Sequence, residues 1–120
     1  MKRFYKSAKF AFNGLKYMIL TQRNFKIQLV CAIITISLGY FFEVNTIEWA
    51  LLSICISIVL GFEILNTSIE YLCDIVNPQT NMKIKVIKDL AAAAVLIVGF
   101  TSLVVGLIIF LPKLFVFFKI

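Results

Sequence analysis

Three long apolar stretches dominate this sequence, at about residues 25–42, 47–73 and 86–111. The second and third reach the roughly 20 residues that an α-helix needs to cross a bilayer, whereas the first must borrow length from its flanks. A hydrophobic content of 62% and a mean hydropathy of +1.00 exceed the roughly half apolar content of a soluble domain. The sequence therefore predicts an all-α membrane protein with three transmembrane helices, in a single domain over residues 1–120.

The segment before the first stretch, residues 2–19, has the pattern of an amphipathic helix. Apolar side chains such as Phe4 and Leu15 fall on one side, and Lys2, Lys9 and other cations fall on the other. Seven of the 12 lysines and arginines lie within residues 1–26, so the net charge of +6 indicates lipid headgroups and not nucleic acid as the partner. We expect a surface helix on an anionic membrane. A solvated helix packed on a partner domain is the alternative.

The distribution of charge in the loops predicts the orientation. The amino-terminal segment is basic, residues 43–48 contain no cation, and several lysines follow Asp74. Cations are enriched in cytoplasmic loops, so the amino terminus and the second loop are expected in the cytoplasm. Asn77-Pro78 is expected to end the second span, because proline disfavours helix in the residue before it.

A stripe of polar residues lies within the second apolar stretch. Glu63, Asn66, Glu70 and Asp74 fall within about 80° of the helix circumference. An ionised carboxylate in hydrocarbon costs at least a few kcal/mol, so several on one face indicate a hydrated or cation-filled site. The alternative is that these groups bind one another or neighbouring helices. Like charges at this spacing repel, however, unless a proton, a lysine or a metal lies between them.

Lys88 and Asp89 open the third span at about the depth where the second span ends, so Lys88 can reach back toward Glu70 and Asp74. The carboxylate of Asp89 is also favoured near a helix amino terminus, whatever its chemical role. The chain contains no histidine, and hard oxygen ligands of this kind suit Mg²⁺. Mg²⁺, lysine and carboxylates together indicate phosphoryl transfer, although no P-loop or protein-kinase signature is present.

Two runs carry a longer resemblance: residues 63–70 (EILNTSIE) with Asp74, and residues 88–96 (KDLAAAAVL). The sequence resembles the prokaryotic diacylglycerol kinase family of small membrane enzymes, which includes the undecaprenol kinases. Features nearer the ends resemble the undecaprenol kinase branch: residues 23–25 (RNF), 47–49 (IEW) and 106–113 (GLIIFLPK). The resemblance implies a homotrimer in the prokaryotic cell membrane that uses ATP and Mg²⁺ to phosphorylate a lipid hydroxyl, on undecaprenol or diacylglycerol.

The resemblance also implies roles for individual residues. Glu63 is expected to be the general base and Glu70 a metal ligand, with Asn66 and Asp74 ordering the site or contacting the substrate. The residues expected at the ATP site are Arg3, Phe10, Thr80, Asn81, Met82, Lys88 and Asp89.

The sequence departs from the family pattern at Gln22, where the family generally has a second metal-binding glutamate. An amide oxygen can ligate Mg²⁺ without contributing charge, so weaker metal binding is expected. Two other functions remain open on the sequence alone: a small cation-coupled transporter that uses the same carboxylates, and a catalytically weakened kinase homologue.

Overall fold

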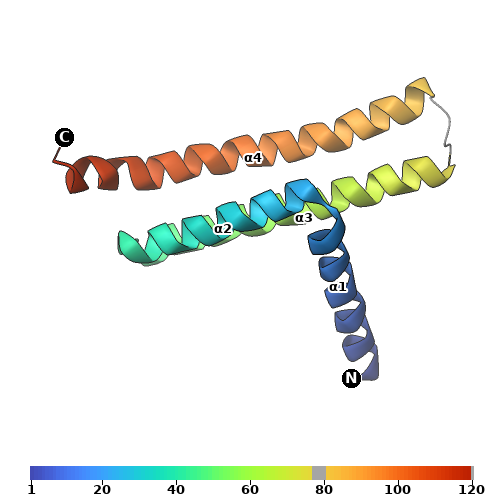
Figure 1. Cartoon of the computed structure of the whole chain (residues 1–120), viewed down its shortest axis with the longest axis horizontal. Helices are drawn as coiled ribbons and strands as arrows, with labels where there is room; N and C mark the ends of the chain where they lie inside the picture. Colours follow the sequence, from blue (N-terminus) through green and yellow to red (C-terminus); the bar gives the residue numbers. More distant parts are fainter. Residues whose placement is uncertain (77–80, 120) are drawn as a thin grey trace.

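The computed structural model describes residues 1–76 and 81–119, and these residues form helices with no strand among them (Figure 1). The helices are α1 (Lys2–Thr21), α2 (Arg23–Phe41), α3 (Thr46–Val76) and α4 (Met82–Phe117). The all-α prediction is confirmed. The expected helix break at Asn77-Pro78 and the expected nucleotide contact Thr80 lie outside the described residues.

Three of these helices, α2, α3 and α4, are long and apolar enough to cross a membrane, and α1 precedes them. This confirms the three expected spans and the amino-terminal helix. α3 and α4 extend beyond the predicted apolar stretches: α3 continues past residue 73 to Val76, and α4 begins before residue 86 at Met82 and continues past residue 111 to Phe117. At 1.5 Å per residue, the 31 residues of α3 and the 36 of α4 extend about 46 and 54 Å, more than the roughly 30 Å of hydrocarbon in a bilayer.

α4 continues through Pro112 and ends at Phe117, past the end of the predicted span at residue 111. Proline has no amide hydrogen, so the carbonyl of Ile108 loses its usual helical partner. Membrane-spanning helices tolerate such a position because local adjustments and neighbouring groups satisfy the freed carbonyl.

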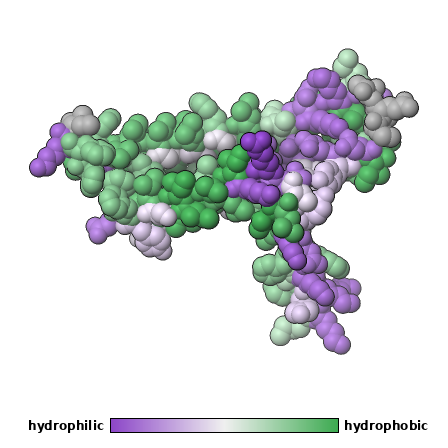
Figure 2. All heavy atoms as spheres, viewed as in Figure 1, coloured by the Kyte–Doolittle hydropathy of each residue, from purple (hydrophilic) through white to green (hydrophobic). Residues whose placement is uncertain are grey.

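The three spans lie roughly along one another, and α1 leaves them at a steep angle (Figure 1). α3 packs mainly against α4, and α2 packs on α3. Polar residues gather on α1 and at the end of the bundle where α3 ends and α4 begins, whereas the middle of the spans is apolar (Figure 2). We call this polar end of the bundle the site end.

The opposite end of the bundle is held by close helix packing. A Cβ atom built on Gly39 would lie 2.6 Å from Cη2 of Trp49, so α2 and α3 approach closely only because residue 39 has no side chain. The Tyr40 ring also lies against Trp49, with ring centroids 4.9 Å apart. A small buried cluster of Val44, Leu52 and Ile109 joins α3 to α4 nearby.

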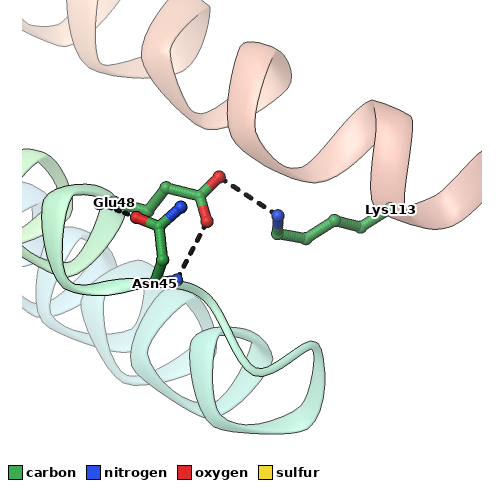
Figure 3. Close-up of polar contacts among 3 residues, drawn as sticks. All are labelled: Asn45, Glu48 and Lys113. Carbon is green, nitrogen blue, oxygen red and sulfur yellow. Dashed lines mark hydrogen bonds and ion pairs between the residues drawn. The ribbon is translucent and has the colours of Figure 1, made fainter.

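A polar cluster fastens the same end (Figure 3). Asn45 Oδ1 accepts from the Glu48 amide at 2.8 Å, and Glu48 Oε1 accepts from the Asn45 amide at 3.0 Å, which is a reciprocal cap on the first turn of α3. The second carboxylate oxygen of Glu48 lies 3.1 Å from Lys113 Nζ on α4. The Glu48 carboxylate therefore caps the first turn of α3 and also links α3 to the last turns of α4.

Candidate active site

The polar stripe on α3 becomes more exposed toward the site end. Glu63 is 6% exposed, whereas 61% of the Asp74 side chain is exposed. With Thr46 at one membrane surface, the roughly 20 residues that cross the hydrocarbon end near Glu63 and Asn66. Glu70 and Asp74 then lie beyond that boundary, where water and charged ligands can reach them.

Glu63 has a polar partner on α2. Gln28 Nε2 donates a hydrogen bond to Glu63 Oε2 at 3.3 Å. Two amide oxygens, Gln28 Oε1 and Asn66 Oδ1, are buried and have no hydrogen-bond partner among the described residues. Buried oxygens of this kind normally have a partner. This part of the bundle is therefore rich in acceptors and suits a ligand that donates a hydrogen bond.

Gln28 was not among the site residues expected from the sequence. It lies near the start of the first apolar stretch and carries no charge, so the charge and hydropathy patterns did not single it out. The available signal was its carboxamide, because a polar group in a membrane-spanning helix generally faces the bundle and finds a polar partner there.

Gln28 also lines a cavity of about 420 Å³ between α2, α3 and α4. The cavity walls are mainly apolar, with contributions from Ala32 on α2, Leu52 on α3, and Leu103 and Phe110 on α4. An apolar cavity with one carboxamide near a buried carboxylate has room for a segment of hydrocarbon that ends in a polar group.

Gln22 lies at the junction of α1 and α2, where hydrogen bonds fix its amide group. Its Nε2 donates to Tyr71 Oη at 3.0 Å and to Thr21 Oγ1 at 3.2 Å. Thr21 Oγ1 donates its only hydrogen to the Tyr17 carbonyl at 2.7 Å, so it can only accept from Gln22. The atom that faces Thr21 is therefore the nitrogen, and the amide oxygen of Gln22 is left available for another ligand.

Tyr17 completes this junction. Its hydroxyl donates to Tyr71 Oη at 3.0 Å, and the two rings meet edge to face with centroids 6.1 Å apart. The hydrogen bond to Tyr71 is the main cause that raises the pKa of the Tyr17 phenol above its ordinary value of 10.0. Because Tyr71 follows Glu70 on α3, these contacts hold the end of α1 beside the turn that carries Glu70.

Lys88 reaches back from α4 to α3, as the sequence predicted. Its Nζ lies 2.6 Å from Asp74 Oδ1. Asp89 pairs with Lys85 one turn earlier on α4, at 2.7 Å. The structure therefore places Lys88 and Asp89 at the site end, each already in contact with an opposite charge.

The other residues expected at the nucleotide site are more dispersed. Arg3 and Phe10 lie on α1, and Phe10 is 71% exposed. Asn81 is the amino-terminal cap of α4, where its side chain accepts from the Lys83 amide at 2.8 Å. Met82 begins α4 and is exposed. In one chain the structure does not bring Arg3 and Phe10 to Lys88, so their nucleotide contacts stay predictions.

The donor groups at the site end fit Mg²⁺. Glu70 offers a carboxylate, and Gln22 offers an amide oxygen that engages in no hydrogen bond within residues 1–76 and 81–119. The same residues contain no group of three or more His, Cys, Asp or Glu side chains that could enclose a metal. Mg²⁺ commonly takes only one or two protein ligands and completes its shell with phosphate oxygens and water.

The model of the prokaryotic diacylglycerol kinase family matches residues 9–110. The chain belongs to this family. The matched region includes the polar stripe on α3, Gln22, and the Lys88-Asp89 pair. Arg3 lies before the matched region.

Named relatives agree with this assignment. An undecaprenol kinase of Bacillus subtilis is 35% identical over 95% of this chain and 93% of its own length. A diacylglycerol kinase of Synechocystis is 32% identical over 90% of this chain and 62% of its own length. A diacylglycerol kinase of Helicobacter pylori is 29% identical over 80% of this chain and 75% of its own length. These names are those of lipid kinases, which confirms that part of the functional prediction.

Proposed function

We propose that this kinase transfers the γ-phosphoryl group of Mg²⁺-bound ATP to the hydroxyl of a membrane lipid, and that its preferred acceptor is undecaprenol. The observation that carries the proposal is the placement of Glu63. Its carboxylate is buried near the membrane boundary, one hydrogen bond from an apolar cavity, on the same face of α3 as Glu70. A base that must meet an alcohol at the end of a hydrocarbon chain needs this position.

The reaction follows from these placements. The cavity beside Gln28 holds the hydrocarbon next to the hydroxyl, so the hydroxyl oxygen approaches Glu63. That oxygen attacks the γ-phosphorus, its proton passes to Glu63, and the bond from the γ-phosphorus to the bridging oxygen of ADP breaks. Lys88 lies at the site end, where its charge favours the nucleotide phosphates.

Glu70 and Gln22 would hold the metal ion. A Mg²⁺ ion held by these two residues would neutralise charge on the nucleotide phosphates. Glu70 supplies charge, and Gln22 supplies a neutral oxygen oriented by Thr21 and Tyr71. The hydrogen bonds of Tyr71 keep these two donors near the same turn of α3.

Support for undecaprenol as the acceptor comes from similarity. The undecaprenol kinase of Bacillus subtilis matches nearly the full length of both chains, whereas this chain covers 62% of the Synechocystis diacylglycerol kinase. The cavity walls are mainly apolar, as a polyprenyl chain requires. Diacylglycerol is the competing acceptor.

The proposal includes a homotrimer and a cytoplasmic site end. The trimer rests on the family resemblance. The orientation is supported by the position of the cations, because Lys83, Lys85 and Lys88 lie in the first turns of α4, at the site end, and α1 is basic. Polar side chains gather on these same elements (Figure 2).

Cysteine labelling of whole cells tests the orientation with Thr46→Cys, at the other end of the bundle, in a variant whose Cys31, Cys55 and Cys73 are replaced by alanine. Labelling of intact cells is expected. Labelling that occurs only after the cells are opened would mean that the site end faces the outside.

The decisive experiment supplies purified protein with γ-labelled ATP, Mg²⁺ and an equimolar mixture of undecaprenol and diacylglycerol. Labelled undecaprenyl phosphate is expected to exceed labelled phosphatidic acid, and Glu63→Gln is expected to abolish both products. If labelled phosphatidic acid is in excess, diacylglycerol is the preferred acceptor and the protein is still a lipid kinase. No labelled lipid under any metal condition, together with cation flux in proteoliposomes without ATP, would favour the transporter.

A further inference from the structure

We propose that Gln28 is a positioning residue that holds the Glu63 carboxylate in the orientation needed to receive the acceptor proton. This inference rests on the proposed function, because it assigns Glu63 the role of base. It concerns a residue of α2 that the sequence patterns did not indicate.

The geometry assigns Gln28 a single polar task among the described residues. Its Nε2 donates to Glu63 Oε2 at 3.3 Å, while its Oε1 is buried and accepts from no group of the described chain. Glu63 is 6% exposed, so bulk water supplies few alternative donors. In this low-dielectric setting, one hydrogen bond to a carboxylate has a large effect on its orientation.

The chemical type of the donor also suits a base. A lysine at this position would form an ion pair with Glu63 and weaken its ability to accept a proton. A carboxamide is neutral and occupies only Oε2. The other carboxylate oxygen, Oε1, accepts no hydrogen bond in the part of the chain that the structure describes, so it is available to the lipid hydroxyl.

Gln28 is also placed to connect the base with the acceptor. It belongs to α2 and Glu63 to α3, and the cavity lies between these helices and α4. The hydrogen bond therefore orients Glu63 from the wall of the cavity itself. Movement of α2 relative to α3 would change the direction of the carboxylate as well as the width of the cavity.

Substitutions can separate this role from simple packing. Gln28→Met keeps the length of the side chain and removes both polar atoms. Gln28→His restores one donor and one acceptor, because a neutral imidazole carries one of each. Ser37→Ala is the control, since Ser37 lies on the same helix, is exposed and bonds only to the Ile33 carbonyl of its own helix, at 2.8 Å.

The kinetic test measures kcat and the KM for ATP in detergent micelles that contain the acceptor lipid. Gln28→Met is expected to lower kcat about tenfold with an unchanged KM for ATP, as loss of one hydrogen bond predicts. Gln28→His is expected to recover most of kcat, and Ser37→Ala to match the parent protein. Full activity of Gln28→Met would overturn the proposal. The proposal would also be overturned if Gln28→Met lowered both kcat and the melting temperature, and Gln28→His restored neither of them.

A second measurement does not depend on turnover. The carboxyl band of Glu63 can be assigned in the infrared spectrum as the band that Glu63→Gln removes. Gln28→Met is expected to shift this band, and Ser37→Ala is expected to leave it in place. An unshifted band would refute the positioning role. A shifted band in a protein that phosphorylates no lipid would instead refute the proposed function and keep the contact.

Discussion

Lys88 Nζ on α4 lies 2.6 Å from Asp74 Oδ1 on α3, a contact that joins the last turns of one span to the first turns of the next. The side chains are 37% and 61% exposed, so the ion pair contributes little to stability in water. Its importance is the location of the lysine. Asp74 keeps a cation at the end of the bundle where the phosphates are expected.

Lys88→Met is therefore expected to raise the KM for ATP about tenfold or more, because a charge beside the nucleotide phosphates is lost. Asp74→Asn is expected to have a smaller effect, since the lysine remains. Steady-state kinetics over a range of ATP concentrations measures both. Lys83→Met is the control, since it removes a nearby exposed cation that was assigned no role. An equal effect of Lys83→Met and Lys88→Met would indicate general attraction by positive charge.

Gln22→Glu is expected to strengthen metal binding. A carboxylate adds negative charge beside Glu70, so the Mg²⁺ concentration for half-maximal activity should fall about tenfold, equivalent to about 1.4 kcal/mol. Titration with Mg²⁺, and with Mn²⁺ observed by electron paramagnetic resonance, measures the change. Gln22→Met should act in the opposite direction. An unchanged metal dependence in both variants would remove residue 22 from the metal site.

Gly39→Ala is expected to destabilise the bundle, because the new Cβ would lie 2.6 Å from Cη2 of Trp49. The melting temperature in detergent is expected to fall. Gly61→Ala is the matched control, since a Cβ there meets nothing within 4 Å and alanine has the higher helix propensity by about 1 kcal/mol. Equal melting temperatures of the two variants would contradict this prediction and would mean that the Trp49 ring can shift to make room for the Cβ atom.

Deletion of residues 1–16 is expected to abolish phosphorylation and leave the three spans inserted. The deletion removes Arg3, Phe10 and most of the basic face of α1, but it keeps Tyr17 and Gln22 at the junction. Lipid phosphorylation measures the first effect, and resistance of the membrane-embedded protein to carbonate extraction measures the second. Activity in the shortened protein would exclude this part of α1 from the mechanism.

The sequence predicted the spans because hydrophobicity and length are properties of the chain alone. It also predicted the contact between Lys88 and Asp74, since both residues lie near one short connection between two antiparallel helices. It could not predict the ends of α4. Pro112 and Lys113 interrupt the apolar run after residue 111, yet residues 114–117 (LFVF) are apolar again and the helix continues through the proline to Phe117.

The partner of Glu63 could not be predicted for a different reason. Gln28 and Glu63 are 35 residues apart, and the contact depends on the rotation of α2 against α3. That rotation is set by details such as the close approach of Trp49 to Gly39, which no periodicity reveals. Likewise, the orientation of the Gln22 amide follows from the direction of the Thr21 hydroxyl.

The gradient of exposure along α3 has a consequence for how a soluble nucleotide and a lipid can meet. Glu63 and Glu70 are two helical turns apart, which places about 10 Å of depth between them. In the proposed mechanism, Glu63 accepts a proton from an alcohol that stays in the bilayer, while Glu70 acts on phosphates that stay in water. In this mechanism the helix crosses the dielectric boundary and neither reactant has to. A single-residue insertion between the two glutamates would disrupt this arrangement, because it would rotate Glu70 by about 100° relative to Glu63 and leave the two about 80° apart on the helix.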